Sequence, residues 1–543
     1  MIINEIKLKT SESTETIPAK IKKKTGQKVR NWRIIRESID ARNKKEIRRV
    51  YSVEFNFDKD EMDELEELKR SLDIPTVNLS AGGKRAETAE SLNAAEIKAD
   101  RPVVVGFGPA GIFAALVLAR AGLRPIVIER GSDVDCRTAQ VERFWKEGIL
   151  DVNSNVQFGE GGAGTFSDGK LTTGIKDPAI GFVLSELASH GAPEEIRYKA
   201  KPHVGTDVLR TVVKNIREEI ISLGGEVFFD TLACGLIIEG GSVRGLSAVS
   251  GGEERTVNAR DIIFAIGHSS RDTFRWLNDS RIVMSRKPFS IGLRIEHRQD
   301  DIDIAQYGKT AAELKLDAAD YKLSYRCENG RGVYTFCMCP GGEVIVASSQ
   351  EGGVVTNGMS YHKRDSGKAN SALLVDVRID DFESEDTLAG VDFQEKYEKT
   401  AYRNGRLQFE SGKRDSIGGG NYAAPTATWA ELREGKAPLV EECLPWFAVD
   451  AMREAMPHLG RKLKGFDSDD ARVYAVEARS SSPVRFKRDE DYEGFIEDID
   501  DNNITVKLNG FYPCGEGAGY AGGIMSAAVD GIKVAAAIIR KYL

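Results

Sequence analysis

Two glycine-rich stretches have residue types and spacing that could bind a nucleotide. Residues 103–116 read VVVGFGPAGIFAAL and residues 158–171 read FGEGGAGTFSDGKL, and both contain the pattern G-x-G-x-x-G. Glycines at this spacing leave backbone N–H groups bare, so that a pyrophosphate can approach the chain at the start of a helix. The chain could therefore hold two dinucleotides or only one.

The first stretch has every part of a dinucleotide site. The apolar run before Gly106 predicts a strand, and the apolar run after Gly111 predicts a helix. Gly106 would make the tight turn, Gly108 would let the pyrophosphate reach the backbone, and Gly111 would let the helix pack on the strand. Glu129 ends the next apolar run, where a carboxylate would accept hydrogen bonds from adenosine ribose hydroxyls.

The second stretch lacks the flanking elements of such a site. The residues before it, DVNSNVQF, are polar and turn-prone, and the residues TFSDGKLTT contain no apolar helix. Its glycines therefore predict a loop whose bare N–H groups can face an anion, with Thr165 and Lys170 adding a hydroxyl and a cation. We expect both stretches to serve one cofactor, and we expect no dedicated second domain for NAD(P).

Cysteine and metal chemistry are not indicated by the pattern of residues. Cys337 and Cys339 form C-x-C in a predicted strand, where alternate residues share a face, and we interpret both as buried apolar residues. Cys514 has no second cysteine close to it in sequence, so a disulfide mechanism is not expected. The six histidines show no ligand spacing, so no metal site is predicted.

Four residues are candidates for contact with a substrate. His203, in KPHVGTDVL, could act as an acid or base, or could pack or cap at a helix entrance. Arg294, in IGLRIEH, lies where the chain enters the inserted domain predicted for residues 288–475. Arg479 and Ser482, in EARSSSPVRF, lie in a polar loop, where arginines could hold an anionic group or pair with local acids.

The elements that must position these residues change in character along the chain. Residues 1–75 predict a small basic α+β domain with strands in EIKLK and RRVYSVEFNF and a helix in DKDEMDELEELKRSL, followed by a connector at 76–100. Residues 101–287 and 476–543 show predicted strands and helices in alternation, as in an α/β domain. Residues 288–475 predict an inserted mixed α/β substrate domain, in which GVYTFCMC and EVIVASS form a hairpin with Gly341 and Gly342 at its tip.

Bulk composition limits the class of protein. The 543 residues, 41% hydrophobic and 29% charged, are ordinary for soluble domains, and every apolar run falls short of the ~20 residues that span a bilayer. Seven scattered cysteines and an N-terminus without a secretory signal favour a cytoplasmic location without membrane attachment. The net charge is −8, yet residues 17–50 hold thirteen Lys or Arg and three acids. This basic segment could bind RNA, another anionic partner or another part of this protein, or could simply face solvent.

The sequence resembles known flavoproteins. GFGPAG, VIERG, GGAGTFSDGKL, DIIFAIG and GFYPCGEGAGYAGGI follow the order of the FAD domain in the glutathione-reductase-like superfamily. GRGVYTFCMCPGGEVIVAS, NGMSYHKRD, RSSSPVRFKRD and GEGAGYAGGIMSAAVDGIK are similar to a largely uncharacterised family of bacterial FAD-dependent dehydrogenases. The resemblance implies an α/β fold, a three-layer FAD-binding Rossmann-like domain interrupted by the substrate domain, and noncovalent FAD.

The resemblance also implies which residues contact FAD. Glu516 stands where the family usually has Asp, one methylene shorter, in contact with the ribityl chain, and residues 522–524 would open the last helix toward the flavin ring. The implied cofactor residues are Gly106, Gly108, Pro109, Ala110, Gly111, Glu129, Arg130, Gly162, Gly164, Thr165, Lys170, Leu171, Gly267, Gly515, Glu516, Gly522, Gly523 and Ile524.

The function expected from the sequence is hydride transfer between FAD and an unidentified small organic substrate, in either direction. NADH or NADPH could visit the flavin transiently as a donor. Two alternatives stay open: a flavoprotein that acts on RNA or binds it through the basic N-terminal domain, and a binding scaffold in which FAD is structural. The sequence does not indicate an oligomeric state.

Overall fold

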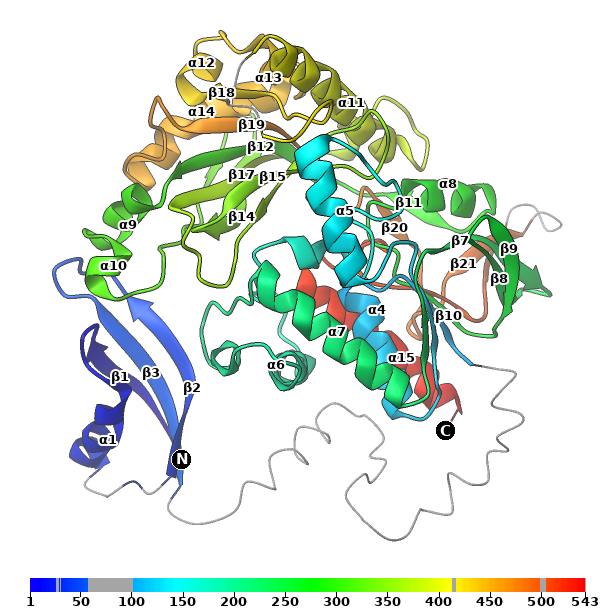
Figure 1. The fold of residues 1–543 in the computed structure, drawn as a ribbon, viewed down its shortest axis with the longest axis horizontal. Coiled ribbons are helices and arrows are strands. Elements are labelled where there is room, and N and C mark those ends of the chain that lie inside the picture. The colour runs from blue at the N-terminus through cyan, green and yellow to red at the C-terminus, as the bar shows by residue number, and fades with distance from the viewer. Residues whose placement is uncertain (26–28, 30, 57–100, 413–416, 499–503, 543) are drawn as a thin grey trace.

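The computed structural model describes residues 1–25, 29, 31–56, 101–412, 417–498 and 504–542. The predicted helix at residues 58–72 and the predicted connector at 76–100 lie outside the described residues. Figure 1 shows the three described parts of the chain: an N-terminal sheet, a unit built on a parallel sheet, and a unit built on an antiparallel sheet.

The N-terminal unit is a three-stranded antiparallel sheet with one helix. The predicted strands form β1 (Ile2–Lys9) and β3 (Arg48–Asn56), and β3 pairs with both β1 and β2 (Asn31–Asp40). The helix α1 (Ile17–Thr25) buries Ile17 and Ile21 in the small core of this unit. The sequence prediction had missed α1 and β2, because their many charged residues obscure the apolar periodicity.

The basic segment of this unit meets another part of the same chain. The Glu37 amide donates to Tyr198 O and the Ala200 amide donates to Glu37 O, each at 2.8 Å. The Lys44 ammonium donates to Ala305 O at 2.5 Å, and Arg49 donates to Lys315 O at the same distance. One of the roles predicted for the basic residues, contact within this protein, is therefore observed.

A five-stranded parallel sheet carries the first glycine stretch. Short β-branched runs at VVV, IVI and IIF form its centre, as expected for strands covered on both faces. The strand order is β23-β10-β4-β5-β6. The bounds are β4 (Val103–Val105), β5 (Ile126–Ile128), β6 (Glu226–Phe228), β10 (Ile262–Phe264) and β23 (Phe511–Pro513).

The parallel sheet is the middle of three layers, so the predicted fold class is confirmed. One face, with Val104 and Ile263, packs on the helices α4 (Pro109–Arg120), α7 (Thr206–Ser222) and α15 (Ile524–Tyr542), which lie side by side in Figure 1. The other face, with Val103 and Phe264, packs on an antiparallel sheet. That sheet consists of β7 (Thr231–Glu239), β8 (Ser242–Ser250) and β9 (Glu253–Asn258).

A six-stranded antiparallel sheet forms the other large unit. Its order is β13-β14-β17-β12-β19-β18, with the helices α14 (Trp446–Lys462), α11 (Ala389–Glu410) and α9 (Gln299–Tyr307) packed against it. The last long strand, β19, extends past residue 475, where the sequence placed the end of the inserted domain. The bounds are β12 (Phe289–Arg298), β13 (Ser324–Arg326), β14 (Gly332–Pro340), β17 (Lys368–Val377), β18 (Thr426–Thr428) and β19 (Arg472–Glu477).

The predicted hairpin around Gly341 is wrong, although both of its strands exist. β14 pairs with β13 and β17, whereas β15 (Glu343–Ala347) pairs with β16 (Val355–Met359) in a separate ribbon. The turn at Gly341, with φ +53°, thus joins two sheets. Its residues are compatible with a hairpin tip, but β14 pairs with β17, which begins more than twenty residues later, and not with β15.

Among the described residues, none of the helices combines the length and apolarity that crossing a bilayer requires.

The remaining elements connect these layers. The bounds are α5 (Val134–Glu147), α6 (Ala179–Ser189), α8 (Arg271–Asp279), α10 (Ala311–Leu314), α12 (Trp429–Arg433), α13 (Pro438–Glu441), β11 (Met284–Arg286), β20 (Val484–Phe486), β21 (Phe495–Asp498) and β22 (Ile504–Lys507).

Candidate functional site

One cavity lies where the three-layer unit meets the antiparallel sheet. Its lining includes parts of both glycine stretches and the loop after β10 on one side, and residues of β14, β16 and the segment after β19 on the other. Of the residues implied by the resemblance, those on the cavity are Gly106, Gly108, Pro109, Ala110, Glu129, Arg130, Gly162, Gly164, Lys170, Gly267, Glu516, Gly522, Gly523 and Ile524.

The two glycine stretches touch each other backbone to backbone. The Gly161 amide donates to Phe107 O at 2.8 Å, and a Cβ added at Gly162 would lie 2.9 Å from Gly108 Cα. The Gly159 amide donates to Glu129 Oε1 at 2.9 Å. The stretches therefore build one cavity together and do not form two separate nucleotide sites.

The glycine turn after β4 is fixed by close backbone contacts. Gly106 has φ +96°, and an added Cβ would lie 2.4 Å from Ala265 O. An added Cβ at Gly111 would lie 1.9 Å from Gly106 O, so only glycine lets α4 begin this close to the strand. Gly108 differs, because its nearest neighbour to an added Cβ is Gly162 Cα at 3.6 Å and its other side is open to the cavity.

Two helix N-termini face the cavity. α4 starts after Gly108, which makes no side-chain cap, and α15 starts at Ile524 after two glycines. The first N–H groups of a helix have no partner within the helix and carry roughly half a positive charge together. Both ends can therefore hold negatively charged or electron-rich groups.

Glu129 is held rigidly at one end of the cavity. It is 5% exposed, and its carboxylate accepts from the amides of Phe107 at 2.7 Å and of Gly131 and Gly159 at 2.9 Å. A carboxylate has about four acceptor positions, so one remains for a hydroxyl group in the cavity. Arg130 next to it lies over the Phe158 ring at 4.1 Å and pairs with Asp272 at 2.7 Å.

Three buried polar atoms on the cavity wall fit a polar cofactor. Arg130 Nε, Gln157 Oε1 and His268 Nε2 have no hydrogen-bond partner within the described part of the chain. Buried polar groups are normally paired, so two nitrogens and an oxygen left in this state match a ligand with both acceptors and donors. Together with the glycine cradle, these atoms fit FAD.

Sequence reasoning had missed His268, and the structure links it to Glu516. His268 Nδ1 lies 3.4 Å from Glu516 Oε1, and both side chains line the cavity. Glu516, at the position where the resemblance implies an Asp, thus contacts the imidazole. The position of His268 directly after Gly267 was the one signal in the sequence.

Four residues implied as cofactor contacts do not line the cavity. Gly111 packs on the Gly106 turn, and Leu171 is 2% exposed in the core behind it. The Thr165 hydroxyl donates to Glu160 O at 3.2 Å, and the Gly515 amide donates to Asp530 Oδ2 at 2.8 Å. These residues shape the loops that carry the lining residues.

Arg294 does not line the cavity, but it positions residues that do. It is 0% exposed. Burial lowers the pKa of Arg294, but the Glu477 carboxylate raises it, and the net effect is a rise. The guanidinium donates to Glu477 Oε2, Cys337 O and Asn370 Oδ1 at 2.9–3.0 Å. Arg294 is therefore a positioning residue behind Glu477 and Cys337, which do line the cavity.

The interpretation of both C-x-C cysteines as buried is wrong for Cys337. Cys339 is buried, whereas Cys337 has φ +41° and is exposed to the cavity that both residues line. The pairing of β14 with β17 shifts register between Phe336 and Cys339, which breaks the strict alternation of sides. The surrounding protein atoms raise the pKa of the Cys337 thiol, while Arg294 and Lys170 oppose that rise.

Arg479 lines the cavity but is bound within the protein. Glu398, on α11, pairs with Arg479 at 2.7 Å and with Arg271, on α8, at 2.6 Å. Arg479 also donates to Ser349 Oγ at 2.5 Å. Of the two roles predicted for this arginine, pairing with an acid is observed. Ser482 is buried, does not line the cavity, and donates to Val484 O at 2.9 Å.

His203 lies outside the cavity and is stacked on His362, with ring centroids 5.2 Å apart. Its Nε2 donates to His362 O at 3.0 Å. Burial, followed by the charge of Arg364, lowers the pKa of His203 to about 4, so the ring is neutral at neutral pH. This geometry is that of a packing residue.

We expect His203→Gln to reduce the acid sensitivity of the protein. The folded-state pKa of His203 lies below its ordinary value of 6.5, so the unfolded chain binds a proton first and stability falls as pH drops from 6.5 to about 4. The loss is up to roughly 3 kcal/mol. Melting temperatures at pH 7 and pH 4.5 should differ less for the variant than for the wild type; equal differences would contradict the assignment.

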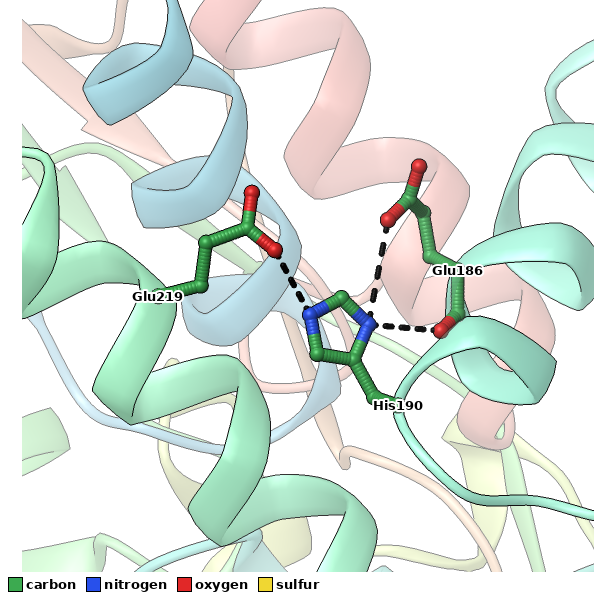
Figure 2. Close-up of side chains that lie close together, drawn as sticks. All are labelled: Glu186, His190 and Glu219. Atoms are coloured by element: carbon green, nitrogen blue, oxygen red, sulfur yellow. Dashed lines mark hydrogen bonds and ion pairs between the residues drawn. The ribbon is translucent and has the colours of Figure 1, made fainter.

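A cluster of two glutamates and a histidine resembles a metal site, but an arginine already binds both carboxylates. Figure 2 shows Glu186, His190 and Glu219, with His190 Nε2 at 2.7 Å from Glu219 and Nδ1 at 2.7 Å from the Glu186 backbone carbonyl. Arg120 donates to both carboxylates at 2.7 Å. Burial alone would raise the pKa of Glu219, but Arg120 and His190 outweigh it and lower that pKa. The cluster ties α4, α6 and α7 together.

The layered fold and its cavity define a dinucleotide-binding protein of the Rossmann type. Residues 288–480 match the family model described as "FAD-dependent protein, C-terminal domain-like", and residues 1–56 match a domain of unknown function. A protein of Clostridium beijerinckii, described as an uncharacterized protein, is 46% identical over 561 residues, which cover 99% of this chain and 98% of that protein. The chain belongs to the family of this protein, a family of FAD-dependent, oxidoreductase-like proteins.

More distant similarity extends over part of the chain. A digeranylgeranylglycerophospholipid reductase of Methanocella arvoryzae is 26% identical over 238 residues, which cover 43% of this chain and 52% of that protein. The solved structure of a geranylgeranyl bacteriochlorophyll reductase-like protein from Thermoplasma acidophilum aligns with 81% of this chain and 78% of its own, at 16% identity and a TM-score of 0.35.

Proposed function

We propose that this protein is an oxidoreductase that binds FAD noncovalently in the cavity and transfers a hydride between the flavin and a small organic substrate. The observation that carries the proposal is the meeting of both glycine stretches, two helix N-termini and Glu129 at one cavity. The opposite wall of this cavity belongs to the region that matches the FAD-dependent family model. The order of the motifs further supports a place in the glutathione-reductase-like superfamily, and the seven scattered cysteines support a cytoplasmic location.

The residues have separate roles in this proposal. Glu129 accepts from the adenosine ribose, and the bare amides at the start of α4 hold the pyrophosphate. When bound, FAD supplies a hydride acceptor or donor at N5. The N-terminus of α15 would favour negative charge on a bound flavin, and Glu516 and His268 would bind polar groups of the cofactor.

The proposal is tested by reconstitution and reduction. Purified protein stripped of nucleotide should bind one FAD per chain and turn yellow. The bound FAD should protect Cys337, which lines the cavity, from alkylation, whereas exposed Cys136 should react as it does without FAD. An anaerobic titration with NADH, then NADPH, should bleach the flavin with one nucleotide if a nicotinamide is the donor. A protein that binds no FAD, or that binds it without protecting Cys337, would contradict the proposal.

The two alternatives predict different results. An RNA-binding flavoprotein would be retained on a polyanion in a salt-dependent way, and deletion of residues 1–75 would abolish the retention. A scaffold with structural FAD would be reduced slowly by every donor. Because Lys44 and Arg49 already contact this chain, oxidoreduction remains the function that the geometry supports best.

A further inference from the structure

A second hollow of about 360 Å³ adjoins the cofactor cavity. Three residues, Phe336, Ser480 and Gly522, line both spaces, so the two spaces adjoin at these residues. Gly522 lies two residues before the start of α15, the end of the cavity at which the flavin ring is proposed. The hollow therefore adjoins the part of the cavity at which the flavin ring is proposed.

Phe336 stands between the two spaces and is unusually exposed for an apolar side chain. Its exposed fraction is 37%, although it lies on β14 in the interior of the fold. The register shift that follows it, with Cys337 at φ +41°, turns the chain so that consecutive side chains both face open space. An apolar ring in this position is stabilised when an apolar ligand covers it.

The walls of the hollow are mostly apolar. Tyr334 and the exposed Phe336 present apolar surface to it, in front of the buried Phe289 and Val377, which are paired across β12 and β17. Ser290, Ser480 and Ser481 add hydroxyl groups to the lining. Asp376 and Arg378 also line it, and since their charged groups lie 3.8 Å apart, they largely offset each other. A site of this volume and lining selects by shape and apolar area rather than by charge.

Resting on the proposed function, we propose that this hollow is the substrate site. It binds an uncharged, largely apolar small molecule, whose reactive end passes Phe336 to reach the flavin. The three shared residues fix where the substrate enters the cofactor cavity, and the apolar walls hold the part of the substrate that does not react.

The test is a titration of FAD-loaded, full-length protein with Nile red, a neutral apolar dye that brightens in apolar surroundings. Phe336→Trp and Ser481→Trp each add bulk at a residue that lines the hollow, and each should weaken Nile red binding about tenfold or more. Phe409→Trp, at a 45% exposed phenylalanine on α11, is the matched control and should bind Nile red like the wild type. FAD affinity should stay unchanged in Ser481→Trp and Phe409→Trp, whose side chains do not line the cofactor cavity, and the melting temperature should stay unchanged in all three variants.

Two results would overturn the inference. Wild-type affinity for Nile red in both hollow variants would show that the dye binds elsewhere, and equal loss in the Phe409→Trp variant would show nonspecific binding. Excitation of the flavin should also produce Nile red emission by energy transfer, which reports that both occupy the same molecule. If FAD does not bind, the proposed function fails, but the emission of Nile red itself still tests the hollow.

Discussion

Gly108→Val should leave the fold intact and lower FAD affinity by about a hundredfold or more, equivalent to about 2.7 kcal/mol. Gly108 has φ −81° and ψ −174°, which valine adopts readily, and an added Cβ meets only Gly162 Cα at an ordinary 3.6 Å. The added methyl groups would occupy the space where the pyrophosphate approaches the start of α4. Flavin fluorescence titration measures the affinity, and the melting temperature of the apoprotein measures the fold.

Two other glycines provide controls for this prediction. Gly174→Val, at a position where an added Cβ meets nothing within 4 Å, should change neither quantity. Gly111→Ala places its methyl group 1.9 Å from Gly106 O, so the backbone must move and stability should fall by about 1–3 kcal/mol or more. A Gly108→Val protein that binds FAD normally would show that the cofactor lies elsewhere.

Glu398→Gln should destabilise the protein by about 3–5 kcal/mol, because it leaves two buried guanidinium groups without a counter-charge. Glu398 is 1% exposed and pairs with Arg271 and Arg479, which together join α8, α11 and the cavity wall. Differential scanning calorimetry at pH 7 measures the loss. Glu383→Gln, which breaks an exposed pair with Lys396, is the matched control and should cost less than about 0.5 kcal/mol.

The stabilities of the wild type and of Glu398→Gln should converge at low pH. Burial raises the pKa of Glu398, but the two arginines outweigh it and lower that pKa from 4.5 to about 2. A depressed carboxyl pKa gives stability that is complete above 4.5 and is lost as pH falls to about 2. The difference in melting temperature between wild type and Glu398→Gln should therefore shrink over this window, and a constant difference would contradict the ion-pair assignment.

The sequence predicted best what is encoded locally. A strand, a glycine turn, a helix and an acid within thirty residues specify the cradle around Gly106, because each part constrains the next. Glu129 could be recognised for the same reason. The second stretch was interpreted correctly as a loop because the residues beside it lack an apolar period.

The parts that depend on distant contacts could not be predicted. The partner of β14 is β17, so a turn sequence at Gly341 gave the wrong pairing. Strand alternation placed Cys337 in the core, but a register shift, set by pairing with residues more than thirty positions later, exposes it. Arg294 looked like a substrate ligand because its partner Glu477 is 183 residues away.

The walls of the cavity come from two different units, since Gly108 lies in the turn after β4 of the parallel sheet and Phe336 lies on β14 of the antiparallel sheet. A ligand that needs both walls binds only the docked arrangement, and mass action then adds RT ln(1 + [L]/Kd) to the free energy of docking. Cofactor occupancy thereby sets how cooperatively the two units unfold. In a cell with little free FAD, the protein would be most open to proteases at this junction, so flavin supply would control its abundance as well as its activity.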